Sequence, residues 1–366
     1  MRSIKTKLFS LAMAVSMVLA LAGCAMSTPS TVGSIGGIEI PAGIYLLAQY
    51  NSYNTAANAA KLATGETASD VKAVLKATCT GTIGDEEVTA TGSEYVAKLT
   101  DRAISYYAEV ERRFTEMNGV LDDAATAEAA DTGDNLWSTN GDLYTANGIS
   151  KTSLQTYLLN AQKAKALLKM TYGPDGTTPV AEDEYTDFVN NDCYYIEAVQ
   201  FPLVDYSTYS MADDDQKAAI MATAETASNS ALYTAAMTYV PQAMAAMGSS
   251  LDASQAVYYA ASQLYTPDDL SSYGSDEYNN LTDPLDEAGL NHWTTINLGT
   301  TILVARKIDP FKTYTVDELN SMYDLLSSMK STDIQSELYA AGAALEHNLN
   351  SSALNTYSAS KIKKNV

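Results

Sequence analysis

Apolar residues recur at steps of three and four along much of this chain, which is the spacing of helices that bury one face. The longest such stretch runs from Glu94 to Leu121, with charged side chains between the apolar positions. A second begins after Ser150, a residue type that favours helix N-caps, and ends at the Gly-Pro-Asp-Gly turn of residues 173–176. Helices should therefore dominate the fold.

Two polar stretches interrupt this pattern. Residues 122–147 are rich in Ala, Asp, Gly and Asn, and residues 273–290 contain Pro284 together with glycines and asparagines. We expect both stretches to be loops, the first with room for one short helix. Residues 122–147 also lack the alternating oxygen ligands of a calcium loop.

Strand-like patterns are few. Two short apolar stretches flank Gly36-Gly37, and longer ones cover residues 193–201 and 301–309. Thr315 and Glu318 have the spacing of a capping box before the last helices. The pattern thus predicts an α+β fold that is predominantly helical.

The N-terminus has the features of a secretory signal. A basic start precedes an apolar run from Leu8 to Leu21 that is too short for a stable bilayer span, and Cys24 follows small residues. Residues 21–24 resemble the lipobox of bacterial lipoproteins. The resemblance implies that residues 1–23 are a cleaved signal peptide and that the Cys24 thiol is acylated. It further implies that residues 24–31 form a tether on the extracytoplasmic face of the bacterial cell membrane. An ordinary cleaved signal with an incidental cysteine is the alternative.

Net charge indicates which partners the chain can bind, and the cysteine count indicates whether a disulfide can form. The net charge is −22, and loss of residues 1–23, which carry three basic residues and no acid, lowers it to −25. Nucleic acid and anionic head groups bind best to clustered basic residues, so we expect no nucleic-acid partner.

Cys79 and Cys193 are far apart in sequence. We expect two free, half-buried thiols, although a disulfide stays possible in an oxidising compartment.

Two segments resemble the PrsA- and SurA-type foldases. Residues 32–41 repeat the strand, glycine turn and apolar stretch that open those proteins, followed by a helix with an early tyrosine, here Tyr45. Gly36 departs from the Asp or Asn usual in that turn. Residues 180–201 repeat the short acidic helix that leads into the first strand of a parvulin-type (PpiC-type) prolyl isomerase domain.

The resemblance implies a domain order. Residues 32–190 would form an N-terminal helical chaperone lobe, residues 191–309 an inserted parvulin-like α/β domain, and residues 310–366 the C-terminal helices that complete the lobe. In the parvulin family, two histidines face each other on the first and last strands. Alignment on Phe201 places Ala198 and Leu303 at those positions, and the chain has only two histidines, His292 and His347. We therefore expect a degenerate isomerase domain.

The function implied is that of a lipid-anchored extracytoplasmic chaperone that binds unfolded or nascent secreted polypeptides with weak or no prolyl isomerase activity. A homodimer is left open. Methionine and aromatic side chains suit irregular apolar clients, although core packing is the simpler explanation for most of them. The candidate client-binding residues are Phe201, Met237, Met244, Tyr258 and Trp293.

Other classes of function lack their sequence signals. Neither a catalytic Ser-His-Asp or Cys-His arrangement nor a metal site can be argued from two histidines, and no phosphate-binding glycine loop follows a strand. We expect no catalytic residues, cofactor or metal. An active prolyl isomerase and a solute-binding lipoprotein of a transporter remain alternatives. The second has two lobes with alternating strands and helices, whereas helices dominate here.

Overall fold

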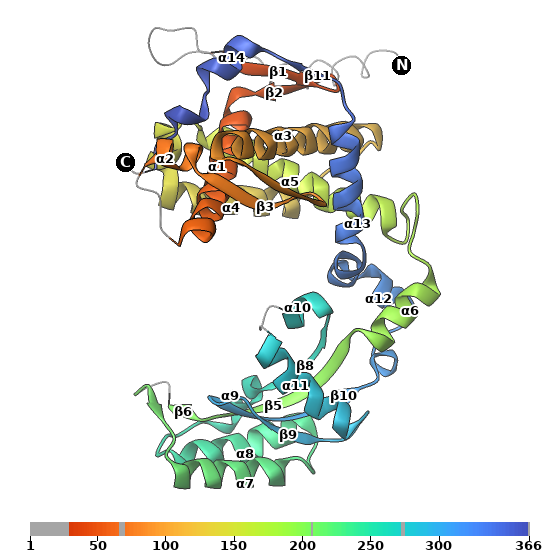
Figure 1. Cartoon of the computed structure of the whole chain (residues 1–366). Coiled ribbons are helices and arrows are strands. Elements are labelled where there is room, and N and C mark those ends of the chain that lie inside the picture. Colours follow the sequence, from red (N-terminus) through yellow and green to blue (C-terminus); the bar gives the residue numbers. More distant parts are fainter. Residues whose placement is uncertain (1–28, 66–69, 206–207, 272–274, 365–366) are drawn as a thin grey trace, which may run out of the picture. The chain divides into compact units, whose positions relative to one another are not determined.

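The computed structural model describes residues 29–65, 70–205, 208–271 and 275–364. They form two compact units (Figure 1). The first unit comprises the described residues within Met1–Ala108, Glu128–Leu158 and Ala343–Val366, and the second those within Glu109–Ala127 and Leu159–Gly342. Helices predominate and the sheets are small and antiparallel, which confirms the predicted α+β class.

A small sheet in the first unit joins the two ends of the described chain. Its order is β11-β1-β2, with β1 (Thr31–Ile35) in the centre, β2 (Ile38–Pro41) on one side and β11 (His347–Leu349) on the other. Gly36 and Gly37 have φ values of 55° and 81°, as a two-residue hairpin turn with two left-handed residues requires. The predicted hairpin is confirmed, whereas the three-residue β11 was not predicted.

The first helix packs as its apolar spacing predicts. α1 (Ala42–Thr64) starts directly after Pro41 and buries Ile44, Leu47 and Ala48. Next come α2 (Val71–Lys76) and a hairpin of β3 (Thr78–Ile83) and β4 (Glu86–Thr91), elements that the sequence analysis did not anticipate.

Three long helices follow. They are α3 (Gly92–Glu116), α4 (Asp123–Ala146) and α5 (Lys151–Tyr172). The predicted amphipathic helix is α3, although Leu121 lies beyond its end. The Ser150 hydroxyl accepts a hydrogen bond from the Ser153 amide at 3.1 Å, so the predicted cap of α5 is confirmed.

The loop predicted for residues 122–147 is wrong, because α4 occupies it. Asp122 starts this helix by accepting a hydrogen bond from the Ala125 amide at 2.7 Å. Its small residues, which looked loop-like, allow close packing instead: Ala129 and Gly133 are buried, and Gly133 lies against Gln155 and Leu158 of α5. Tertiary packing thus outweighs weak local propensity.

The second unit contains a four-stranded sheet of order β8-β5-β10-β9. Its strands are β5 (Tyr194–Pro202), β8 (Ala260–Tyr265), β9 (Thr294–Asn297) and β10 (Thr301–Ile308). The two predicted strands, β5 and β10, are confirmed and pair with each other in the centre. The outer strands β8 and β9 were not predicted, since they are short, with six and four residues.

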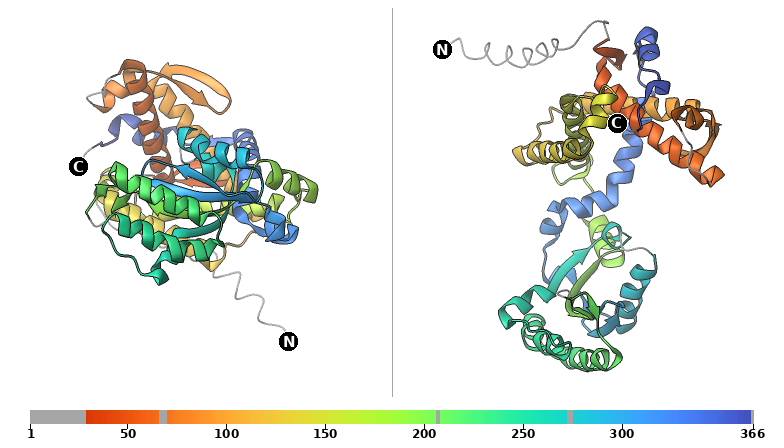
Figure 2. Two further views of the ribbon diagram at one scale, coloured as in Figure 1. Left: turned by 90° about the horizontal axis from the view of Figure 1, so that it is seen from below. Right: turned by 90° about the vertical axis from the view of Figure 1, so that its left-hand side faces the viewer.

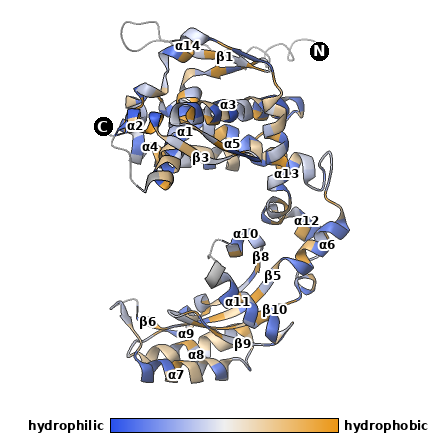
Figure 3. Ribbon diagram, viewed as in Figure 1, coloured by the Kyte–Doolittle hydropathy of each residue, from blue (hydrophilic) through white to orange (hydrophobic). Residues whose placement is uncertain are grey.

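Helices cover both faces of this sheet (Figures 1 and 2). One face packs α7 (Asp214–Ala227) and α8 (Leu232–Ala246) over Val199, Phe201 and Val304. The other packs α10 (Pro267–Ser271) and α11 (Ser275–Ala288) over Ile196, Leu303 and Ala305. Hydrophobic colour predominates along α8, whereas α7 alternates between the two colours (Figure 3). The sheet is thus the centre of a three-layer arrangement.

The loop predicted for residues 273–290 is also wrong, because α11 occupies most of it. Leu281 and Leu285 lie one helical turn apart and pack against the sheet, with Leu285 fully buried. This apolar stripe keeps the helix together although Pro284 lies inside it. Proline has no N–H, so the carbonyl of Asn280, four residues earlier, receives no hydrogen bond from position 284.

One further long helix is α13 (Tyr323–Ala343). The remaining elements are short: α6 (Glu182–Asn191), β6 (Val204–Asp205), β7 (Ser210–Met211), α9 (Ala253–Ala256), η2 (Val257–Tyr259), η3 (Pro310–Lys312), α12 (Val316–Ser321), α14 (Ser351–Thr356) and η4 (Ala359–Lys361). The predicted acidic helix is α6, and the predicted capping box of Thr315 and Glu318 starts α12. β6 pairs with β7 shortly after β5.

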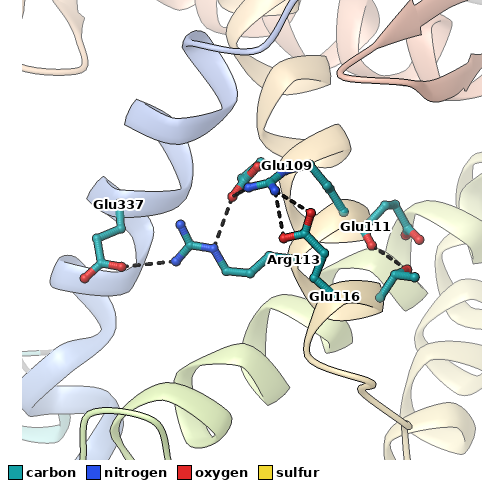
Figure 4. A network of polar contacts seen from close by, with 7 residues as sticks. Glu109, Glu111, Arg113, Glu116 and Glu337 are labelled. Atoms are coloured by element: carbon teal, nitrogen blue, oxygen red, sulfur yellow. Dashed lines mark hydrogen bonds and ion pairs between the residues drawn. The ribbon is translucent and has the colours of Figure 1, made fainter.

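A polar network holds α13 against the end of α3 within the second unit (Figure 4). The buried Glu109 carboxylate accepts hydrogen bonds from Arg112 and Arg113, at 2.7 and 3.1 Å. Arg113 also pairs with Glu337 at 3.1 Å, and Glu337 accepts the Tyr172 hydroxyl hydrogen at 2.5 Å. A buried carboxylate needs such partners, since an unpaired charge would be costly.

The four-stranded sheet lies within residues 191–309, the range predicted for the inserted domain. The contact-defined units have other bounds, which fall inside α3, α4, α5 and α13, so the functional domain ranges remain predictions. Among the described helices, none combines the length and the apolar composition needed to cross a membrane. Cys24 and the signal peptide lie outside the described residues.

Candidate functional site

A pocket of about 560 Å³ lies on the α11 side of the four-stranded sheet. Strands β5, β8, β9 and β10, helix α11 and the turn between β9 and β10 all contribute to it. Its lining residues are Ile196, Ala198, Gln200, Ala261, Tyr265, Asn280, Leu281, Asn297, Leu298, Gly299, Thr300, Thr301 and Leu303. Its size is in the range of pockets that hold small ligands or short peptide segments.

The apolar part of the lining comes from the central strands. Ala198 pairs with Ala305, and Leu303 pairs with Gln200 two positions along, so Ala198 and Leu303 are diagonal neighbours on one face of the sheet. These are the positions at which the sequence alignment expected parvulin histidines. The register therefore brings them together as predicted, but with side chains that carry no proton-transferring group.

The polar side chains of the lining are three amides, two threonine hydroxyls and the Tyr265 phenol. Gln200, Asn280 and Asn297 are exposed, and the Asn297 side-chain oxygen accepts the Gly299 amide hydrogen at 2.9 Å. Leu298 lies between Asn297 and Gly299 in the β9–β10 turn, lines the pocket and is 37 % exposed. The rim can therefore donate and accept hydrogen bonds without carrying charge.

The lining contains no charged residue, although the whole chain has a net charge of −22. Tyr265 is the one lining residue with a titratable side chain. General acid–base chemistry needs a group whose pKa lies near the working pH. The lining thus combines apolar and uncharged polar side chains with the single titratable group of Tyr265. Within the described residues, no cluster of His, Cys, Asp and Glu could hold a metal ion.

The five predicted client-binding residues lie elsewhere in the second unit. Phe201 and Met244 are buried, at 0 % and 8 % exposure, in the core between the sheet and α7 and α8. For these two a surface role is wrong in this structure: Phe201 alternates with the pocket-facing residues of β5, and Met244 faces the sheet. Met237 and Tyr258 are exposed, at 42 % and 86 %. Their role remains a prediction.

Trp293 is half-buried against the same core. The Arg306 guanidinium lies 4.7 Å from its ring centroid and pairs with Glu197 at 2.6 Å. This arrangement uses the tryptophan face for a cation–π contact within the fold. Trp293 does not line the pocket, and its client-binding role also remains a prediction. Neighbouring His292 is exposed, as expected.

The structure assembles a serine, a histidine and an aspartate that the sequence analysis did not connect. In the first unit, His347 Nε2 lies 3.2 Å from Ser105 Oγ, and His347 Nδ1 lies 3.2 Å from Asp101 Oδ1. Ser105 is 2 % exposed in the middle of α3, and its hydroxyl donates to the Asp101 carbonyl oxygen at 2.7 Å. No substrate can reach Ser105, so the cluster ties β11 to α3. Ser105 and His347 are 242 residues apart, so no local sequence pattern indicated that they meet.

Both cysteines of the described chain are free, and both are buried rather than half-buried. The Cys79 thiol contacts the Ala56 carbonyl oxygen at 3.3 Å. Burial raises the pKa of Cys79, and burial with nearby Asp192 and Asp269 raises the pKa of Cys193 to about 12. Since the thiolate is the nucleophile, neither residue is suited to covalent chemistry.

Comparisons with known proteins give only weak likenesses, all of them to solved structures. No family model and no curated protein matches the chain. Among solved structures, the foldase protein PrsA from Streptococcus pneumoniae aligns over 76 % of this chain and 98 % of its own, with 9 % identity and a TM-score of 0.37. So low a TM-score does not demonstrate a common fold, and neither fold nor function is transferred from it.

Proposed function

We propose that this protein is a lipid-anchored extracytoplasmic chaperone that holds unfolded secreted polypeptides and has weak or no prolyl isomerase activity. The pocket on the four-stranded sheet carries the proposal, because it offers an apolar floor and an uncharged rim that contains three amides, with Tyr265 as its one titratable side chain. Unfolded segments present apolar side chains and unpaired backbone amides, which such a lining can match.

The sequence supports the other parts of the proposal. Residues 21–24 resemble a lipobox, and acylation of Cys24 would keep the chain at the membrane surface. The resemblance to parvulins, aligned on Phe201, puts Ala198 and Leu303 at the positions of the two histidines. Isomerisation can still be assisted by desolvation of the proline amide, so the proposal allows a small residual rate.

The solute-binding alternative has less support. Every strand pair in the described residues is antiparallel, whereas alternation of strands and helices in two α/β lobes favours parallel sheets. The active-isomerase alternative predicts a clear rate with proline peptides, which the experiment below measures.

The test uses residues 25–366, which lack only the proposed signal peptide and lipidated cysteine. Aggregation of a chemically denatured secreted protein is followed by light scattering with and without this chain, and a protease-coupled assay measures isomerisation of a proline peptide. We expect suppressed aggregation and a rate close to the spontaneous one. No effect in either assay would refute the chaperone proposal, and a large isomerase rate would favour the alternative.

A matched pair of variants connects the activity to the pocket. Leu298→Ser removes an exposed apolar residue from the rim, and Leu290→Ser makes the same change at a position that is 47 % exposed and outside this pocket. Both substitutions are at exposed positions and should leave stability within about 0.5 kcal/mol. We expect only Leu298→Ser to weaken the suppression of aggregation.

Membrane anchoring has its own test. The full chain and a Cys24→Ser variant are expressed in a bacterium, and detergent phase partitioning and incorporation of labelled fatty acid are measured. The proposal predicts that only the unaltered chain is labelled and partitions with detergent. Equal behaviour of both chains would show that Cys24 is not the anchor.

A further inference from the structure

The pocket lining also restricts what kind of segment it can hold. Resting on the chaperone function proposed above, we infer that the pocket binds an uncharged, extended polypeptide segment through its backbone amides and one apolar side chain, without a requirement for proline.

The floor suits one apolar side chain. Ile196, Ala198 and Leu303 are buried residues of the central strands that nevertheless line the pocket. The small Ala198, with Ala261 beside it on β8, leaves room above the sheet between larger neighbours. A leucine-sized side chain placed there removes apolar surface from water on both partners. A charged side chain would lose its hydration without finding a partner.

The rim suits a peptide backbone. Gln200, Asn280 and Asn297 each carry both a donor and an acceptor, the two kinds of group that an extended backbone presents. Pro284 adds to this pattern, since it cannot donate to the backbone carbonyl of Asn280. The Asn280 carbonyl thus lacks the N–H partner that position 284 would normally supply, and Asn280 itself lines the pocket.

Proline would fit this rim less well than other apolar residues. It has no N–H, so a proline seated in the pocket removes one donor that the amide and carbonyl acceptors of the rim could pair with. The apolar floor also has no polar side chain that would stabilise the twisted amide of a proline during isomerisation. Recognition should therefore follow apolar character and backbone hydrogen bonding.

The test measures binding of labelled, end-blocked hexapeptides to residues 25–366 by fluorescence polarisation. The parent peptide contains serine and threonine with one central leucine, and three others replace that leucine by alanine, aspartate or proline. We expect alanine and aspartate to weaken binding about tenfold or more, and proline to bind more weakly than leucine. Equal or tighter binding of the proline or aspartate peptide would overturn the inference.

A second measurement uses two adjacent exposed asparagines of α11. Asn280→Asp replaces an amide of the rim by a carboxylate, and Asn279→Asp adds the same charge on the same helix outside the pocket lining. We expect Asn280→Asp to weaken the leucine peptide about threefold or more and Asn279→Asp to leave it unchanged. Equal effects of the two substitutions would overturn the assignment to this pocket.

The aggregation assay separates the two proposals. If the chain suppresses aggregation but binds none of the peptides, the inference about the pocket is wrong, and unfolded polypeptides bind to another surface of the chain. If the chain neither suppresses aggregation nor binds a peptide, the chaperone function itself fails. Peptide binding with the expected order of affinities supports both.

Discussion

At the residue scale, burial decides the chemistry of the two thiols. Cys79 is 0 % and Cys193 2 % exposed, and both have raised pKa values. A reagent that reacts with thiolates should therefore find neither of them in the native protein.

We predict that residues 25–366 react with a thiol reagent only on unfolding. Titration with an aromatic disulfide at pH 8 should give almost no rapid reaction in buffer and two thiols in 6–8 M denaturant, a concentration range typical of complete unfolding. A fast reaction of one thiol in buffer would contradict the burial of both cysteines. Fewer than two reactive thiols per chain in denaturant would indicate a disulfide.

Tyr172 shows how burial together with one hydrogen bond can make stability depend on pH. Burial, followed by the hydrogen bond to Glu337, raises the pKa of Tyr172 to about 12. In the unfolded chain the hydroxyl would titrate near its ordinary pKa of about 10. Because the folded-state pKa is the higher one, the contribution of the protonated hydroxyl is complete below pH 10 and is lost as the pH rises towards 12.

We predict that the stability difference between the unaltered chain and Tyr172→Phe shrinks from pH 9 to pH 11. Phenylalanine keeps the ring and has no proton to lose, so only the unaltered chain should lose this contribution. Urea unfolding of both proteins at each pH measures the difference. A constant difference over this range would show that Tyr172 does not titrate as described.

At the scale of elements, the small β11-β1-β2 sheet depends on one glycine. Gly33 has a φ of 116°, which disfavours other residues, and a β-carbon there would lie against the Asn348 carbonyl oxygen of β11. The close approach of β1 and β11 therefore requires a residue without a side chain.

We predict that Gly33→Ala destabilises the protein more than Gly37→Ala. Gly37 also has a positive φ, 81°, but a β-carbon at that position meets nothing within 4 Å. The control should cost about 1–2 kcal/mol from backbone strain alone, and Gly33→Ala should cost more because the strands must separate. Urea unfolding measures both costs, and hydrogen exchange of the β11 amides locates the damage. Equal costs would show that the close approach is unimportant.

At the scale of the whole molecule, the C-terminal segment completes the first unit. Its β11 pairs with β1, Ala353 is fully buried with Val32 and Ile35, and Ile362 packs beside Cys79 and Tyr95 in a separate core. The Asn147 side chain also accepts the Lys363 amide hydrogen at 2.8 Å. Residues that are distant in sequence thus share the cores of this unit.

We predict that removal of residues 343–366 unfolds the first unit and spares the four-stranded sheet, whose strands and covering helices lie between residues 194 and 308. Calorimetry should show loss or a large downward shift of one transition, and limited proteolysis should leave a fragment that contains β5 and β10. Loss of both transitions would show that the sheet does not fold without the first unit.

The sequence determined those elements that a local pattern encodes. The three-to-four spacing specified α3 and α5, Gly36 and Gly37 specified the β1–β2 hairpin, and continuous apolar runs specified β5 and β10. Alignment on Phe201 also identified Ala198 and Leu303 as the positions to inspect. Each of these signals is short in sequence, because periodic burial and turn geometry are properties of adjacent residues.

Only the tertiary structure decided the rest. Residues 122–147 form α4 because small side chains let it pack against α5, and residues 275–288 form α11 because two leucines reach the sheet. The pairing of β11 with β1, the Ser105–His347 contact and the pocket over Ala198 and Leu303 all join residues far apart in the chain. Such contacts depend on which segments meet after folding, and the sequence pattern of neither segment alone contains that information.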